Sequence, residues 1–208
     1  MFKARFLSIL ILYPFLSTYA DEPLIVNQSA QASNPADYKQ SYWHASLGQA
    51  NFSKEKANTE GIEDSALLLL IGLDWQRENW NLGAGIGTLL IQDNSSFKSH
   101  VIDQYGNESS ESSNISSLLA YGEGGYSVRL LNNSISVDAK FGYEYLSTER
   151  EIPNCSDCPS DSVDLSSGFY AKPKINIHLK NFIISASYQQ FLKESSRNNI
   201  SIGIGAKY

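Results

Sequence analysis

The sequence has no long apolar segment after its first twenty residues. The longest later apolar run is 66–71, and the mean hydropathy is −0.27. A transmembrane helix needs about 20 consecutive apolar residues, so none is expected here. The sequence also has no excess of basic residues, because its net charge is −6. This argues against nucleic acid and heparin as partners, since both bind basic patches.

The N-terminus has the pattern of a secretory signal peptide, predicted at residues 1–20. Lys3 and Arg5 precede the apolar run 6–15, and small residues before Ala20 indicate cleavage after that position. The run is too short for a helix that spans a bilayer. An uncleaved helical anchor is the alternative. Removal of the segment would change the net charge from −6 to about −8.

Cysteine is scarce, and Cys155 and Cys158 are the two that the sequence contains. In a cytosolic protein this CxxC spacing would indicate redox or zinc chemistry. In an exported chain with no nearby histidine, we predict a small disulfide within a loop. A redox-active dithiol and a pair of reduced thiols are the alternatives. No metal site, cofactor or catalytic residue is predicted.

After residue 37, segments with period-two hydrophobicity alternate with polar segments. In 135–145, apolar residues at odd positions alternate with polar or small residues at even positions. This alternation is typical of a strand with one apolar face. Residues 21–37 lack it and carry two prolines, so they are predicted to be a flexible periplasmic lead-in. Eight strands are predicted, at residues 41–52, 66–75, 80–90, 116–130, 135–145, 163–179, 182–192 and 199–208.

The connections between these strands alternate in length. Short turns are predicted at 76–79, 132–133 and 180–181. Longer loops are predicted at 53–65, 92–114, 147–162 and 193–199. Tight turns at one end and long loops at the other are typical of an outer-membrane β-barrel with both chain ends on the periplasmic side.

The polar faces of the predicted strands carry many charged side chains. They are Asp74, Glu123, Arg129, Asp138, Lys140, Glu144, Lys172, Lys174, His178 and Lys207. A basic side chain that faces lipid at the bilayer midplane costs about 2–4 kcal/mol, so these groups must face water or one another. The opposite faces carry large aromatics, such as Trp43, Trp80 and Phe141, which a small barrel interior barely admits. The pattern therefore favours a membrane barrel with a polar lumen over a soluble barrel with an apolar interior.

Charges of both signs in the lumen predict a salt-bridged network. Its predicted members are Glu123, Arg129, Asp138, Lys140, Glu144, Lys172, Lys174 and His178. A stabilising network fits a lumen that side chains fill. Gating of a narrow pore is the alternative.

The pair His44 and Ser46 is similar to the His-x-Ser of outer-membrane lipid A deacylases, in which a glutamate completes a triad. Here both residues lie on the predicted inward face of the first strand, with no evident glutamate partner. Acyl transfer needs a base within hydrogen-bond reach of the nucleophile, and access to the substrate. A lipid A-modifying enzyme is therefore kept only as an alternative.

The C-terminal segment carries the most specific motif. Ser201, Gly203, Ala206 and Tyr208 occupy the polar, glycine, hydrophobic and aromatic positions of the signal read by the barrel-assembly machinery. With this motif, residues 38–208 resemble the small eight-stranded outer-membrane barrels of the OmpA transmembrane domain, OmpX and Ail type. Ala206 stands where an aromatic residue is often found. Pro173, in mid-strand, predicts a bulge or local kink.

The resemblance implies an all-β fold: an eight-stranded antiparallel transmembrane β-barrel of up-and-down topology, in a Gram-negative outer membrane. We expect a non-catalytic structural or surface-interaction role through four extracellular loops. The alternatives are a narrow pore gated by lumen charges and a lipid A-modifying enzyme. The expected partners are outer-membrane lipids, lipopolysaccharide and the barrel-assembly machinery, with no nucleic acid. The sequence names no extracellular partner, and a monomer is expected.

Overall fold

The computed structural model describes residues 39–94, 97, 99–102, 108–111, 113–151, 161–165, 167–192 and 197–207. Its elements are β1 (Lys39–Phe52), α1 (Lys54–Glu60), β2 (Ser65–Arg77), β3 (Trp80–Leu90), β4 (Ser99–Ile102), β5 (Glu108–Glu111), β6 (Asn114–Leu130), β7 (Ile135–Glu151), β8 (Asp161–Ser162), β9 (Gly168–His178), β10 (Phe182–Phe191) and β11 (Arg197–Lys207). The predicted signal peptide 1–20, the lead-in 21–37, Cys155, Cys158 and Tyr208 lie outside the described residues.

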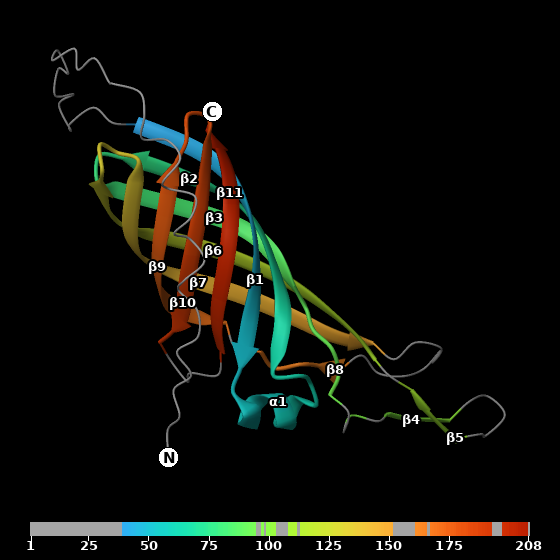
Figure 1. Ribbon diagram of the computed structural model, residues 1–208. Helices are drawn as coiled ribbons and strands as arrows, with labels where there is room; N and C mark the ends of the chain where they lie inside the picture. Colours follow the sequence, from blue (N-terminus) through green and yellow to red (C-terminus); the bar gives the residue numbers. More distant parts are fainter. Residues whose placement is uncertain are drawn as a thin grey trace, which may run out of the picture. The chain divides into compact units, whose positions relative to one another are not determined.

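Eight of the described strands form a closed antiparallel barrel (Figure 1). Around the ring the order is β1, β2, β3, β6, β7, β9, β10 and β11, and β11 pairs with β1 to close it. Each strand therefore pairs with the next barrel strand in the chain. This confirms the predicted eight-stranded antiparallel barrel with up-and-down topology. Outside the ring, β4 and β5 pair as a separate hairpin and β8 pairs with the end of β7.

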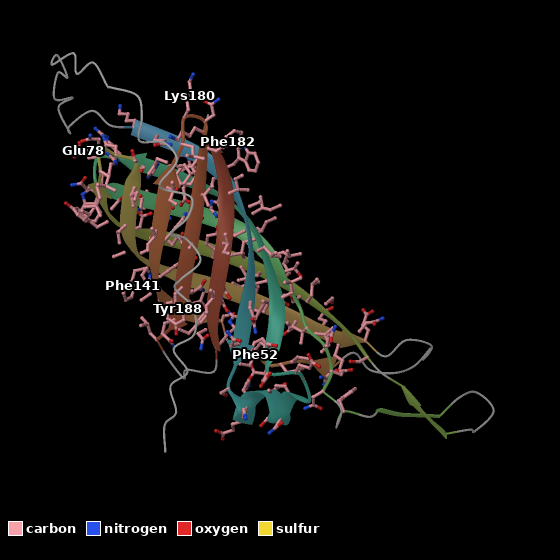
Figure 2. The ribbon with its side chains drawn as sticks, in the orientation of Figure 1. Phe52, Glu78, Phe141, Lys180, Phe182 and Tyr188 are labelled. Atoms are coloured by element: carbon pink, nitrogen blue, oxygen red, sulfur yellow. The ribbon has the colours of Figure 1, made fainter. Side chains whose placement is uncertain are left out.

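The two ends of the barrel differ. Short turns join β2 to β3, β6 to β7 and β9 to β10 at one end, which we call the short-turn end (Figure 1). The helix α1, β8 and the β4–β5 hairpin lie at the opposite end, which we call the long-loop end. Glu78 and Lys180 mark the short-turn end and Phe52 the long-loop end in Figure 2. The predicted alternation of connection lengths is thus confirmed.

Side chains alternate between lumen and outer wall along each strand. On β7, Lys140 and Glu144 are each 2% exposed, whereas Phe141 is 58% and Tyr143 is 44% exposed. Figure 2 shows Phe141 and Tyr188 on the outer surface of the barrel. The apolar phase therefore faces outward and the charged phase inward, as predicted for a membrane barrel.

One predicted loop, 53–65, contains the helix α1. The hydroxyl of Ser53 accepts a hydrogen bond from Lys56 N at 3.3 Å, which caps the first turn. Gly61 ends the helix with φ of 66°, a left-handed conformation that glycine adopts readily. These are ordinary start and stop signals for a helix, but the segment is too short to show helical periodicity. Within the described residues, no helix combines the length and apolar character needed to cross a bilayer.

Two features of the strand predicted at 163–179 differ from expectation: its start is wrong, and of the bulge or local kink predicted at Pro173 the bulge is absent. Regular pairing begins only at Gly168, and Val163 and Leu165 are buried loop residues instead. Pro173 introduces no extra residue, because Ser187 pairs with Lys174 and Gln190 with Ala171, three residues further on each strand. The pairing of β9 with β10 is interrupted at Pro173, which has no backbone N–H to donate. On the other side of β9, Pro173 still pairs with Ala139 of β7.

Two glycines on β6 provide a matched test of strand packing. A Cβ atom at Gly125 would lie 2.2 Å from Ala139 O and 2.8 Å from Lys140 Cα, whereas a Cβ atom at Gly122 meets nothing within 4 Å. We predict that Gly125→Ala lowers the free energy of unfolding by about 1–3 kcal/mol, because β6 and β7 must move apart. Gly122→Ala is the control and should change it by less than about 0.5 kcal/mol. Urea unfolding in lipid vesicles measures both, and equal effects would contradict the packing described here.

Candidate functional site

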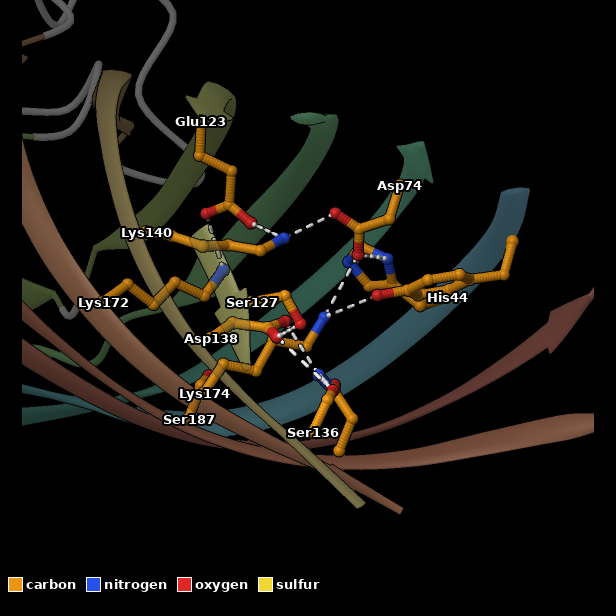
Figure 3. A network of polar contacts seen from close by, with 12 residues as sticks. His44, Asp74, Glu123, Ser127, Ser136, Asp138, Lys140, Lys172, Lys174 and Ser187 are labelled. Atoms are coloured by element: carbon orange, nitrogen blue, oxygen red, sulfur yellow. Dashed lines mark hydrogen bonds and ion pairs between the residues drawn. The ribbon is translucent and has the colours of Figure 1, made fainter. Parts of the chain in front are cut away.

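Two carboxylates inside the barrel share one lysine. Nζ of Lys140 on β7 donates to Asp74 Oδ1 on β2 at 2.6 Å and to Glu123 Oε1 on β6 at 2.9 Å. All three side chains are at most 1% exposed. Figure 3 shows Lys140 between the two acids. Charges this deeply buried are tolerated only when each has a close partner of opposite sign.

Two further lysines on β9 complete the pairing. Nζ of Lys172 lies 2.9 Å from Glu123 Oε2, and Nζ of Lys174 lies 3.1 Å from Asp74 Oδ2. The hydroxyl of Tyr170 also donates to Glu123 Oε2, at 2.8 Å. Positions 170, 172 and 174 face the lumen together because side chains alternate along a strand. We call the following residues the central network: His44, Asp74, Tyr121, Glu123, Lys140, Tyr170, Lys172 and Lys174.

His44 extends this network from β1. Its Nδ1 lies 3.2 Å from Asp74 Oδ2, and its Nε2 lies 3.0 Å from the hydroxyl of Tyr121. Acid, imidazole and hydroxyl follow one another as in a catalytic triad. The hydroxyl is enclosed, however, because a Cβ atom would lie 2.2 Å from it at Gly72 and 2.6 Å from it at Gly85. This relay therefore leaves little room for a substrate atom beside the hydroxyl.

The predicted pair of His44 and Ser46 is not brought together. The two ring nitrogens of His44 face Asp74 and Tyr121 instead. His44 is also 4% exposed. A base that activates a serine must form a hydrogen bond with its hydroxyl, so the geometry lacks the first requirement of the deacylase alternative.

The eight residues of the predicted lumen network fall into four groups: the central network, a group around Asp138, the pair of Glu144 with Arg197, and Arg129 at the short-turn end. Those in the central network are Glu123, Lys140, Lys172 and Lys174. Asp138 lies in a separate group, where it accepts hydrogen bonds from Ser127 Oγ at 2.7 Å and Asn176 Nδ2 at 2.7 Å. His178 touches the same group through Ser136, whose Oγ lies 3.0 Å from His178 Nε2.

The remaining two predicted residues lie nearer the barrel ends. Glu144 pairs with Arg197 and accepts from Gln189 Nε2 at 3.0 Å. Arg129 donates to the carbonyl of Glu78 at 2.8 Å, at the short-turn end. The predicted charges therefore form several separate groups rather than one continuous network.

Among the acidic, basic and imidazole side chains of these groups, the predicted network omitted Asp74, His44 and Arg197. Asp74 is a polar-face charge that the predicted network omits, and it pairs across the lumen with strands that are not its neighbours. His44 was considered only together with Ser46. Arg197 fell inside the predicted loop 193–199, although the structure places it in β11. The inward phase was the available signal for Asp74 and His44, but contacts across a lumen leave no mark in local spacing.

The half of the lumen near the long-loop end is filled by apolar side chains. Leu89 and Leu119 are completely buried, and Leu68 is 1% exposed. We call this cluster the apolar plug. Its members are Ala50, Phe52, Ala57, Ile62, Ala66, Leu68, Leu70, Leu89, Ile91, Leu119, Tyr121, Leu146, Val163 and Leu165. The plug was not predicted, because the inward faces of the strands were expected to be mainly polar.

Arg150 ties the loops together over this plug. Its guanidinium donates to the Glu60 carbonyl at 2.7 Å and to Asp93 Oδ1 at 3.1 Å. It also lies 4.0 Å from the centre of the Phe97 ring. One side chain from β7 therefore holds the end of α1 and the segment that follows β3.

A second contact fixes the helix to the segment before β9. Nζ of Lys56 lies 3.2 Å from Glu60 Oε1 and 3.1 Å from Asp164 Oδ2. Partial burial lowers the pKa of the Lys56 ammonium, but the contacts with Asp164 and Glu60 outweigh it and leave the pKa above its ordinary value. Lys56 thus stays charged at neutral pH.

Three residues of the predicted assembly signal lie on the strand that closes the barrel. Ser201 and Gly203 face inward on β11, and Ala206 pairs with Trp43 of β1 and Phe182 of β10. A Cβ atom at Gly203 would lie 2.5 Å from Ser46 Oγ, so this position is crowded. The crowding explains why position 203 needs a glycine for packing, whether or not the barrel-assembly machinery also reads this residue.

The closed ring, the apolar outer wall and the ion-paired lumen define a membrane-spanning β-barrel. The sequence matches the outer membrane protein beta-barrel domain family over residues 24–208. The chain belongs to this family and is therefore an outer-membrane protein of the Gram-negative type. No curated protein matches the chain significantly.

The chain is similar to several solved outer-membrane barrels at low sequence identity. Ail, the attachment invasion locus protein of Yersinia pestis, is 10% identical with a TM-score of 0.52, over 83% of this chain and 99% of that one. Neisserial surface protein A is 10% identical with a TM-score of 0.49, over 82% and 97%. The N-terminal barrel of Pseudomonas aeruginosa OprF is 14% identical with a TM-score of 0.44, over 82% and 100%. At these identities, only the resemblance to Ail in fold carries weight.

We predict that Lys140→Met destabilises the barrel by about 3–5 kcal/mol, because it leaves Asp74 and Glu123 each short of a buried cationic partner. Urea unfolding in vesicles measures the change. Lys180→Gln, an exposed lysine in the turn after β9, is the control and should stay within about 0.5 kcal/mol of the parent. Equal unfolding curves for Lys140→Met and the parent would show that Lys140 carries no such pairing.

Proposed function

We propose that this protein is a closed, non-catalytic outer-membrane barrel that acts through its long-loop end. The observation that carries the proposal is the filling of the lumen by ion pairs in one half and by the apolar plug in the other. A filled lumen supports neither transport nor turnover inside the barrel. The exposed loops are then the part of the chain available to a partner.

The topology supports an orientation for this surface. In outer-membrane barrels, short turns face the periplasm and long loops face the outside. We therefore propose that α1 and the β4–β5 hairpin are extracellular, and that β1 begins and β11 ends on the periplasmic side. Outer-membrane lipids and lipopolysaccharide would surround the wall, and the barrel-assembly machinery would read β11.

The loop end has features suited to presenting a surface. Arg150 and Lys56 fix α1 to the segments around it, so this part of the surface is preformed. The exposed side of α1 carries Lys54, Glu55 and Asn58. The β4–β5 hairpin extends further from the barrel (Figure 1). Surface attachment, in the sense that the name of Ail describes, is the role we propose for this end.

Attachment of bacteria to a cultured epithelial monolayer tests this role. Expression of the chain in a non-adherent Gram-negative host should raise attachment. Replacement of residues 97–111 by a Gly-Ser linker of equal length should remove most of the gain. The control is Asn132→Gly/Asn133→Gly at the opposite end, which should keep it, because glycine adopts the positive φ of both positions readily. Attachment that survives the loop replacement would exclude the hairpin, and no gain from the parent chain would count against the role.

A narrow pore is the second candidate, and one observation favours it. Buried polar atoms without partners among the described residues occur in the side chains of Asn81 and Asn199, at opposite ends of the lumen. Such atoms mark places where water could enter. A continuous water path through the lumen would have to pass the apolar plug, which lies between the long-loop end and the central network.

Conductance in planar bilayers separates the two candidates. We predict no ion-conducting steps for the parent chain, because Leu89 and Leu119 block the lumen. Leu89→Ser with Leu119→Ser should introduce small steps by making the plug polar. Leu118→Ser with Leu90→Ser changes the same residue types on the outer wall and is the control. Steps in the parent that disappear in Lys140→Met would instead establish a pore gated by lumen charges.

A further inference from the structure

Two basic side chains of the outer wall lie opposite one another at the short-turn end. Lys39 begins β1 and Arg77 ends β2, and the register pairs them directly. Like charges directly opposite on one sheet face are destabilising unless something neutralises them. Both side chains are exposed, and within the described residues neither forms a hydrogen bond or an ion pair.

The pair lies on the membrane-facing side of the wall. Arg77 shares the outward phase of β2 with Trp75, and Lys39 shares that of β1 with Trp43. Arg77 also pairs with Trp80 of the neighbouring strand β3, and Trp80 is 66% exposed. Tryptophan is typical of the interface between hydrocarbon and lipid headgroups. The two cations are level with Trp80 in the register, so we expect them at the depth of the lipid headgroups.

The described side chains around the pair are aromatic or polar, and none of them forms an ion pair with it. The Trp80 ring packs edge-on against Tyr126 at 5.7 Å, and Asn79 Nδ2 donates to the Tyr126 hydroxyl at 2.8 Å. Glu78 is the acidic residue next to Arg77, but its side chain forms no ion pair with Arg77 or Lys39 within the described residues. Among the described residues the pair has no acidic partner, so its charge would be complemented by an anion.

We propose that Lys39 and Arg77 form a binding site for the phosphate of an anionic glycerophospholipid in the leaflet at the short-turn end. The Arg77 guanidinium can hold two phosphate oxygens at once, and Lys39 adds a second positive charge. An anionic headgroup fits better than a zwitterionic one, because the latter would bring its own ammonium group towards two cations. The site goes beyond the proposed attachment role, which involves the opposite end of the barrel.

The tryptophans make the site directly measurable. Of the three tryptophans in the chain, Trp80 pairs with Arg77 and Trp75 is two residues from Arg77 on β2, whereas Trp43 is four residues from Lys39 on β1. Trp43 is therefore changed to Phe in every chain compared, so that the two remaining tryptophans report on the pair. Brominated acyl chains quench tryptophan on contact, so competition between brominated and ordinary lipids reports which lipid occupies this position. The folded chain would be placed in vesicles of phosphatidylcholine mixed with phosphatidylglycerol, with bromine on one lipid at a time.

We expect the parent to prefer phosphatidylglycerol, and Lys39→Gln/Arg77→Gln to reduce that preference about tenfold. Lys54→Gln/Lys180→Gln removes the same charge elsewhere and should retain the preference. Equal mobility on unheated gels confirms that each variant is folded. Three results would overturn the site: an unchanged preference in the first variant, an equal loss in the control, or loss of the preference when millimolar inorganic phosphate is added, which would indicate a site for free phosphate.

Discussion

The fold depends on keeping ionised groups away from hydrocarbon. The central network meets this constraint by giving both Asp74 and Glu123 cationic partners on two oxygens each. These partners come from β7 and β9, whereas Asp74 belongs to β2, so the ion pairs join walls of the barrel that the backbone ladder does not join. A buried ion pair adds little net stability by itself, but loss of one partner is costly. We therefore expect the network to specify how the walls of the barrel are arranged more than to increase the stability of the fold.

The apolar plug solves a different problem in the same lumen. The polar half would be open to water from the long-loop end if side chains there were small. Leu68, Leu89 and Leu119 fill that space, and α1 covers it by burying Ala57. The lumen thus changes from charged to apolar along its length, with Tyr121 in contact with both parts. Because side-chain packing closes the lumen at this end, we propose that the surface loops carry the function and the interior does not.

Much of the fold was predictable because a strand reports its two faces in the sequence. The alternation along 135–145 predicted the inward position of Lys140 and the outward position of Phe141, and both are confirmed. Val163 and Leu165 show where prediction from alternation fails. They alternate with polar residues as in a strand, but they belong to a loop that packs on the apolar plug. Asp74 shows a second limit: its partners lie across the lumen, and local spacing carries no information about them. Ser53 and Gly61 were readable signals for α1, but only seven residues lie between the caps.

The most direct test of the account is the environment of position 141. A nitroxide label at Phe141→Cys, in a chain with Cys155 and Cys158 changed to serine, can be examined in vesicles by its collisions with oxygen and with a water-soluble nickel chelate. Oxygen concentrates in the hydrocarbon and the chelate in water. The account predicts strong relaxation by oxygen and weak relaxation by the chelate. The reverse result would place this face in an aqueous interior, and would contradict a barrel whose apolar wall meets lipid and whose charges are paired inside.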